Sequence, residues 1–148
     1  MNAGQSAFPP TLQSIETEFE SMEDWDERYE FLVELGRELP SSSDEFKTPE
    51  RVVKGCMSHV WMATCVNPLG HFEIQADSDS LIVKGLLVIL ISALASKTSA
   101  EVLAFDTQEL FDRLGLSQHL SANRRNGLHA MVARIRQLAF EAETPEGT

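Results

Sequence analysis

The sequence predicts an α+β fold, in which a small antiparallel β-sheet packs with several α-helices. Apolar residues recur at helical spacing in the first 40 and last 50 residues, and alternate at period two over residues 58–76. Hydrophobic residues make up 43% and charged residues 24% of the chain, a composition typical of globular proteins. Because 148 residues can bury a core without disulfides or metals, we expect one domain.

That domain is expected to span residues 11–143, with flexible tails at residues 1–10 and 144–148. The opening letters MNAGQSAFPP lack the basic and apolar stretches of a secretory signal. The longest apolar run, residues 81–95, is shorter than the ~20 residues that a membrane span needs. We therefore expect a cytoplasmic protein without membrane contact, whose two cysteines are free thiols.

Two helices are expected in the N-terminal part. Thr11 is a helix cap before apolar residues at positions 12, 15, 19 and 22. Asp24 and Glu27 have the spacing of a capping box, and the second helix should end before Pro40. A polar loop over residues 41–49 follows.

A β-hairpin is expected next, followed by a buried helix. The segments SHVWMATCVN and HFEIQAD alternate at period two on either side of the turn NPLG. Residues 81–95 are apolar on all sides, as in a helix packed inside a core.

Three more helices are expected in the C-terminal part. Capping boxes at Thr98 with Glu101 and at Asp106 with Glu109 each open a short helix, the second ending at Gly115. The last helix carries one apolar face at positions 128, 131, 132, 135, 138 and 139.

Negative charge is concentrated at the start of the chain. Residues 1–50 hold 13 acidic and 3 basic side chains, whereas the remainder holds 10 and 9. This excess makes a nucleic acid an improbable partner and is typical of a solvated acidic face.

Cys56 is the main candidate for chemistry. It follows Gly55, which permits a sharp turn, and it lies in the connection before the first strand, where a loop can present it to another protein. A packing role is equally compatible with its apolar neighbours, and burial does not by itself exclude a reactive role. Cys65 lies within a strand, and we expect it to serve only packing.

Other classes of site are disfavoured. Cys56, His59, Cys65 and His71 do not have the spacing of the usual zinc sites, so no metal is expected. Glycine-rich phosphate loops and a nucleophile-elbow serine are missing from the sequence.

Arg124 is the second candidate. It precedes Leu128 by four residues and so shares the apolar face of the last helix, whereas Arg125 points about 100° away. An arginine there should pair with an acid such as Asp77 or Asp79, and a functional role is the alternative.

The segments VKGCMSHVW, HFEIQADSDSLIVKGLL and QHLSANRRNGLHAM resemble the SufE/CsdE family of sulfur-acceptor proteins. The N-terminal segment DWDERYEFLVELGRELP also matches, and the resemblance extends over residues 24–140. It implies a fold like that of the IscU-type iron–sulfur scaffolds.

The resemblance also implies a function. Cys56 would accept persulfide sulfur from a cysteine desulfurase of the SufS/CsdA type, stimulate that enzyme, and pass the sulfur to a cluster scaffold of the SufBCD type or to another acceptor. The pyridoxal phosphate cofactor belongs to the desulfurase, and no cofactor is expected here. Arg124 is the candidate for stabilising the thiolate or persulfide, and Gly55, Ser58, Trp61 and Asp77 for supporting the cysteine loop.

Two other interpretations remain open. An IscU-type scaffold would bind metal or assemble the cluster itself, but those scaffolds use three cysteines and this chain has two. A regulator that only activates a desulfurase would need no cysteine. The resemblance does not distinguish a SufE-type from a CsdE-type pathway.

Overall fold

The fold was analysed in a computed structural model, which describes residues 8–143. Its helices and strands are, in chain order, α1 (Leu12–Ser21), α2 (Trp25–Glu38), the 3-10 helix η1 (Pro49–Arg51), β1 (Val60–Val66), β2 (Phe72–Ser78), α3 (Leu81–Leu94), α4 (Ser99–Ala104), α5 (Thr107–Arg113), α6 (Leu116–His119) and α7 (Ala122–Glu143). The predicted α+β class is confirmed. The tails expected at residues 1–10 and 144–148 lie largely outside the described residues.

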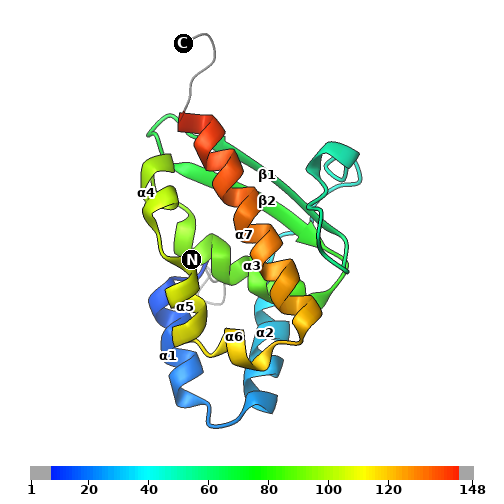
Figure 1. The fold of residues 1–148 in the computed structure, drawn as a ribbon, viewed down its shortest axis with the longest axis vertical. Coiled ribbons are helices and arrows are strands. Elements are labelled where there is room, and N and C mark those ends of the chain that lie inside the picture. Colours follow the sequence, from blue (N-terminus) through cyan, green and yellow to red (C-terminus); the bar gives the residue numbers. More distant parts are fainter. Residues whose placement is uncertain (1–7, 144–148) are drawn as a thin grey trace, which may run out of the picture.

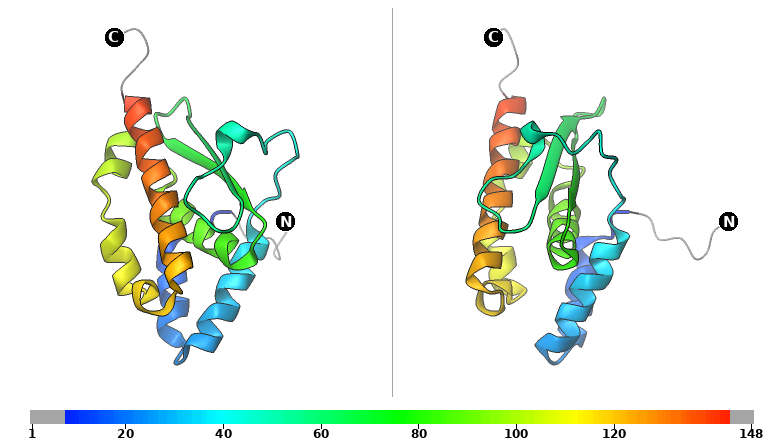
Figure 2. Two further views of the ribbon diagram at one scale, coloured as in Figure 1. Left: turned by 45° about the vertical axis from the view of Figure 1, so that its right-hand side comes forward. Right: turned by 90° about the vertical axis from the view of Figure 1, so that its right-hand side faces the viewer.

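The helices form layers on either side of the centre of the molecule (Figures 1 and 2). The hairpin and α3 lie between α7 on one side and α1 and α2 on the other. The segment between α2 and β1 passes around the hairpin to reach α7 before the chain enters β1. This path places residues 54–59 between the sheet and α7.

The sheet is the predicted hairpin. β1 and β2 are antiparallel, with Val60 opposite Ser78 and Val66 opposite Phe72. The side chains of Val60 and Met62 are buried, which assigns that face of β1 to the core. Val52, in the segment before β1, also pairs with Trp61 of β1 in an isolated antiparallel bridge.

Helix α3 is the centre of the core, as its uniformly apolar sequence predicts. Every residue from Leu86 to Ile91 is at most 3% exposed. Its closest neighbour is α2, and two glycines allow this approach. A Cβ atom on Gly85 would lie 2.1 Å from the carbonyl oxygen of Leu32, and one on Gly36 would lie 2.4 Å from that of Leu81. Both helices therefore pack backbone against backbone.

The predicted caps lie where the sequence places them, but of the three predicted capping boxes the one of Thr98 with Glu101 is complete, whereas those of Asp24 and Asp106 lack the reciprocal bond. The side chains of Thr11, Asp24, Thr98 and Asp106 each accept a hydrogen bond from the backbone three residues on. These bonds satisfy amide groups that have no partner inside the helix.

The short helix α6 was not predicted. It begins after Gly115, which has a φ of 78°. The ring of His119 stacks on Trp25 at 4.3 Å, and the Tyr29 hydroxyl donates a hydrogen bond to the carbonyl oxygen of His119. Contacts with α2 therefore hold a helix that is too short to be stable by itself.

Candidate functional site

The cysteine loop, residues 54–59, connects the segment after η1 to strand β1. Gly55 has a φ of 94°, a conformation that glycine adopts at no steric cost. The next residue, Cys56, is half-buried and faces α7, where its Sγ lies 3.6 Å from the carbonyl oxygen of Gly127. Gly127 has no side chain, and a Cβ there would itself be 3.6 Å from Sγ. The thiol thus packs against bare helix backbone.

A cavity of about 220 Å³ opens beside the thiol, between the cysteine loop, the start of α7 and α3. Its apolar wall consists of Met57, Val83, Leu86, Leu128 and Met131, and its polar wall of Ser58, Ser121, Asn123 and Arg124. Cys56 and Gly127 complete the lining. The cavity therefore offers a reactive sulfur, one cationic group and a largely apolar floor.

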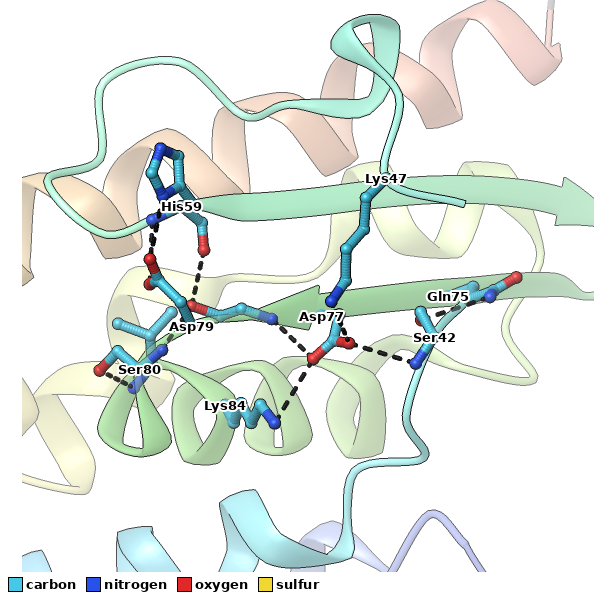
Figure 3. Close-up of polar contacts among 10 residues, drawn as sticks. Ser42, Lys47, His59, Gln75, Asp77, Asp79, Ser80 and Lys84 are labelled. Carbon is cyan, nitrogen blue, oxygen red and sulfur yellow. Dashed lines mark hydrogen bonds and ion pairs between the residues drawn. The ribbon is translucent and has the colours of Figure 1, made fainter. Parts of the chain in front are cut away.

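Both ends of the cysteine loop are fixed. The amide of Val53 donates a 2.8 Å hydrogen bond to the carbonyl oxygen of Val60, which closes the loop at its base. The Ser78 hydroxyl donates to the carbonyl oxygen of His59 at 2.8 Å. The carboxylate of Asp79 accepts from the His59 amide at 3.1 Å and contacts its ring Nδ1 at 2.9 Å (Figure 3). The loop can therefore move only between these two anchors.

Asp77 is a buried carboxylate beside this anchor (Figure 3). Its oxygens accept from the amides of Ser42 at 3.2 Å and Ser78 at 2.8 Å. Lys47 and Lys84 approach it from opposite sides at 3.7 and 3.6 Å. Asp77 thus joins the hairpin to α3 and to the segment after α2. Lys84 is the one charged residue in the apolar run of residues 81–95, and this is the sequence feature that could have indicated a buried acid nearby.

Trp61 lies on the outer face of β1 opposite Asp77 in the register. The Nζ of Lys47 lies 5.1 Å from the centroid of its ring, and the ring of His59 stacks at 5.8 Å. Trp61 therefore contacts the end of the cysteine loop and the cation that pairs with Asp77.

Burial raises the pKa of the Cys56 thiol. This direction is opposite to the lowering expected from a neighbouring guanidinium, because loss of hydration disfavours the thiolate. The role of Arg124 in stabilising the thiolate or persulfide of Cys56 therefore stays a prediction.

The expected environment of Arg124 was also wrong. Its side chain is exposed, because it lies in the first turn of α7, beyond the part of the helix that covers the core. Asp77 pairs with Lys47 and Lys84, Asp79 contacts His59, and no ion pair of Arg124 occurs within residues 8–143. Arg125, rather than Arg124, is half-buried, and its guanidinium donates a hydrogen bond to the carbonyl oxygen of Leu120 at 2.7 Å. Arg124 instead lines the cavity beside Cys56.

Cys65 is exposed, so the expected packing role is wrong. It lies on the face of β1 opposite that of the buried Val60 and Met62, and its Sγ is 3.7 Å from a carboxylate oxygen of Glu73. Desolvation and then the Glu73 charge raise the pKa of its thiol. The alternation of side chains along β1 predicts which residues share a face with Cys65. It does not predict which of the two faces the helices cover.

The candidate metal ligands are divided between the two ends of the hairpin. Cys56 and His59 precede β1, whereas Cys65 and His71 flank the turn. Within residues 8–143, no three histidine, cysteine or acidic side chains are grouped as a metal site would require. No helix in this range has the length and hydropathy of a bilayer crossing.

Comparison with known proteins identifies the family. Residues 13–139 match the SufE family, described as an Fe-S metabolism associated domain. The chain belongs to the SufE family. An uncharacterized SufE-like protein of Rhizobium etli is 40% identical over 144 residues, covering 94% of this chain and 96% of that protein.

A solved structure supports the fold alone. The solution structure of a hypothetical protein from Thermus thermophilus is similar with a TM-score of 0.73, at 20% identity, covering 94% of this chain and all of that one. The SufE family assignment associates the protein with iron–sulfur metabolism.

Proposed function

We propose that this SufE-family protein accepts sulfur on Cys56 from the persulfide of a cysteine desulfurase, and that it stimulates this enzyme by removing the sulfur. The Cys56 thiolate attacks the outer sulfur of the desulfurase persulfide. A new S–S bond forms on Cys56 while the original S–S bond breaks and the desulfurase cysteine leaves as a thiolate. The exchange needs no oxidant.

The observation that carries this proposal is the cavity of about 220 Å³ beside the half-buried thiol. An added sulfur atom has space next to Sγ, and the apolar wall limits the access of water. Cys65 lacks such surroundings, since it is exposed beside the carboxylate of Glu73. This contrast supports Cys56, rather than Cys65, as the acceptor.

Loading requires movement of the cysteine loop. A half-buried sulfur facing α7 cannot reach the active site of another protein, and burial raises the pKa of its thiol, which lowers the thiolate fraction. When the loop swings outward between its fixed ends, hydration removes this rise in the pKa, so the thiolate fraction increases and the sulfur becomes accessible. After loading, return of the loop would place the persulfide in the cavity until a scaffold that assembles iron–sulfur clusters takes it.

The test is intact-mass analysis after incubation with a matched cysteine desulfurase and cysteine. Wild type and Cys65→Ser should each gain one sulfur, whereas Cys56→Ser should gain none. Cys56→Ser should also lose the stimulation of the desulfurase. No sulfur on wild type in the presence of an active desulfurase would contradict the proposal, and full stimulation by Cys56→Ser would instead favour a regulator.

Loop movement is tested separately by hydrogen exchange. The exchange protection of the amides of residues 54–59 should change in the complex with the desulfurase, whereas that of α3 should not. Equal protection of the loop with and without the desulfurase would show that it does not open.

A further inference from the structure

The cavity beside Cys56 is larger than a persulfide needs. A cavity of about 150 Å³ holds a benzene molecule. The 220 Å³ found here therefore exceed the space taken by one added sulfur atom and suffice for a molecule the size of an amino acid. Because the cavity opens to solvent at the rim formed by exposed Met57 and Arg124, such a molecule could enter while the cysteine loop remains in place.

The charge of the lining selects the class of molecule. Arg124 is the charged residue among the described residues that line the cavity, and no carboxylate joins it there. Its guanidinium has no ion pair within residues 8–143. A guanidinium without a partner at the rim of a cavity is suited to a carboxylate, which it can hold by two parallel hydrogen bonds.

The other residues that line the cavity add two requirements for the molecule that it would bind. The apolar wall of Val83, Leu86, Leu128 and Met131 favours a short hydrocarbon chain. Cys56 lines the same cavity, so a molecule held by Arg124 lies next to the sulfur that becomes a persulfide. A thiol is the group that can remove the outer sulfur of a persulfide without a change in oxidation state.

We propose that the cavity binds a small carboxylate-bearing thiol through Arg124, and that the Cys56 persulfide passes its outer sulfur to this thiol. The thiolate of the small molecule attacks the outer sulfur, a new S–S bond forms on the small molecule, and the Cys56 thiolate leaves. The transfer step rests on the proposed persulfide on Cys56, whereas the binding site does not.

The binding site is tested by alkylation, which needs no desulfurase. Iodoacetate carries a carboxylate and iodoacetamide does not, so the ratio of their rates measures the attraction of an anion independently of the thiolate fraction. We would measure this ratio on Cys56 in the Cys65→Ser variant and on Cys65 in the Cys56→Ser variant. One unit charge at about 4 Å in water should raise the ratio about fivefold at Cys56. The Glu73 carboxylate should lower it at Cys65.

Arg124→Gln in the Cys65→Ser background should remove this preference, and high salt should weaken it. The matched control is Arg37→Gln, which removes the same charge from an exposed position on α2 and should leave the ratio unchanged. Equal ratios at both cysteines, unaffected by Arg124→Gln, would overturn the proposal.

The transfer step is tested on Cys56 loaded with sulfur. The sulfur should leave faster with 3-mercaptopropionate than with 2-mercaptoethanol at equal thiolate concentration, with saturation that Arg124→Gln abolishes. Equal, non-saturating rates would overturn the transfer. If Cys56 took no sulfur from the desulfurase but kept its Arg124-dependent preference for iodoacetate, the proposed function would fail and the binding site would stand.

Discussion

The contact between α2 and α3 and the contact between α7 and the cysteine loop both centre on helical glycines, yet they differ in what those glycines face. At Gly36 and Gly85 the neighbour is the carbonyl oxygen of another helix, at 2.4 and 2.1 Å from a Cβ atom built there. At Gly127 the neighbour is the side chain of Cys56 at 3.6 Å, with a cavity beside it. The first contact has no free space, whereas the second can accommodate an added atom. The packing of α2 against α3 therefore leaves no room for a change, whereas the packing of the cysteine loop against α7 does.

The largest expected effect is that of Gly85→Ala. Its Cβ would overlap the backbone of Leu32, so α2 and α3 would have to separate, and we expect a loss of about 3 kcal/mol in the free energy of unfolding. Chemical denaturation monitored by circular dichroism measures this loss. A variant as stable as wild type would show that the helices can shift and that the contact is not fixed.

Asp77→Asn should follow in size. The amide keeps the shape of the side chain but removes the charge between Lys47 and Lys84, and because both lysines are partly exposed we expect a loss of about 2 kcal/mol. Asp79→Asn is the control, since Asp79 pairs with exposed His59 and should cost less than 1 kcal/mol. Equal losses of stability for both variants would contradict the structural role of Asp77.

Gly127→Ala should have a smaller effect of opposite sign to Gly85→Ala. The new methyl group would be in ordinary contact with Cys56, and alanine favours the helix, so unfolding should cost about 0.5–1 kcal/mol more. Thermal unfolding of this variant beside Gly85→Ala makes the comparison directly. If both variants were destabilised alike, the contact at Cys56 would be as tight as that between α2 and α3.

The smallest effect is expected in the pH dependence of Cys56, because the thiol is only half-buried. Burial raises its pKa, so less thiolate is present at a given pH and alkylation by iodoacetamide should reach half its maximal rate at a higher pH than in urea. The Cys65→Ser variant isolates this thiol. A midpoint below that of the unfolded chain would reveal a cation acting on Cys56.

The sequence predicted the regular elements well, because their signals are local. The caps at Thr11 and Asp24, the alternation through the hairpin and the apolar run of α3 each depend on residues close together in the chain. The helix α6 was missed because contacts from Trp25 and Tyr29, some 90 residues away, stabilise it.

The site was predicted less completely. The position of Cys56 in a loop followed from its sequence neighbours, and that of Arg124 near it was implied by family resemblance. The exposure of Arg124 and of Cys65 could not be predicted, because periodicity defines the face of an element but not how far its neighbours extend over it. The cavity joins residues from three separate segments, and no local pattern encodes such a space.

The hydrogen bond between Val53 and Val60 has a consequence for how the protein tolerates change. It closes the six residues of the cysteine loop into a unit whose ends are fixed at one point of the hairpin. A short closed loop can rearrange, or accept substitutions at its exposed positions Lys54 and Met57, without altering the register of β1 and β2. Changes at these two positions would therefore leave the hairpin and the helices that support the loop in place.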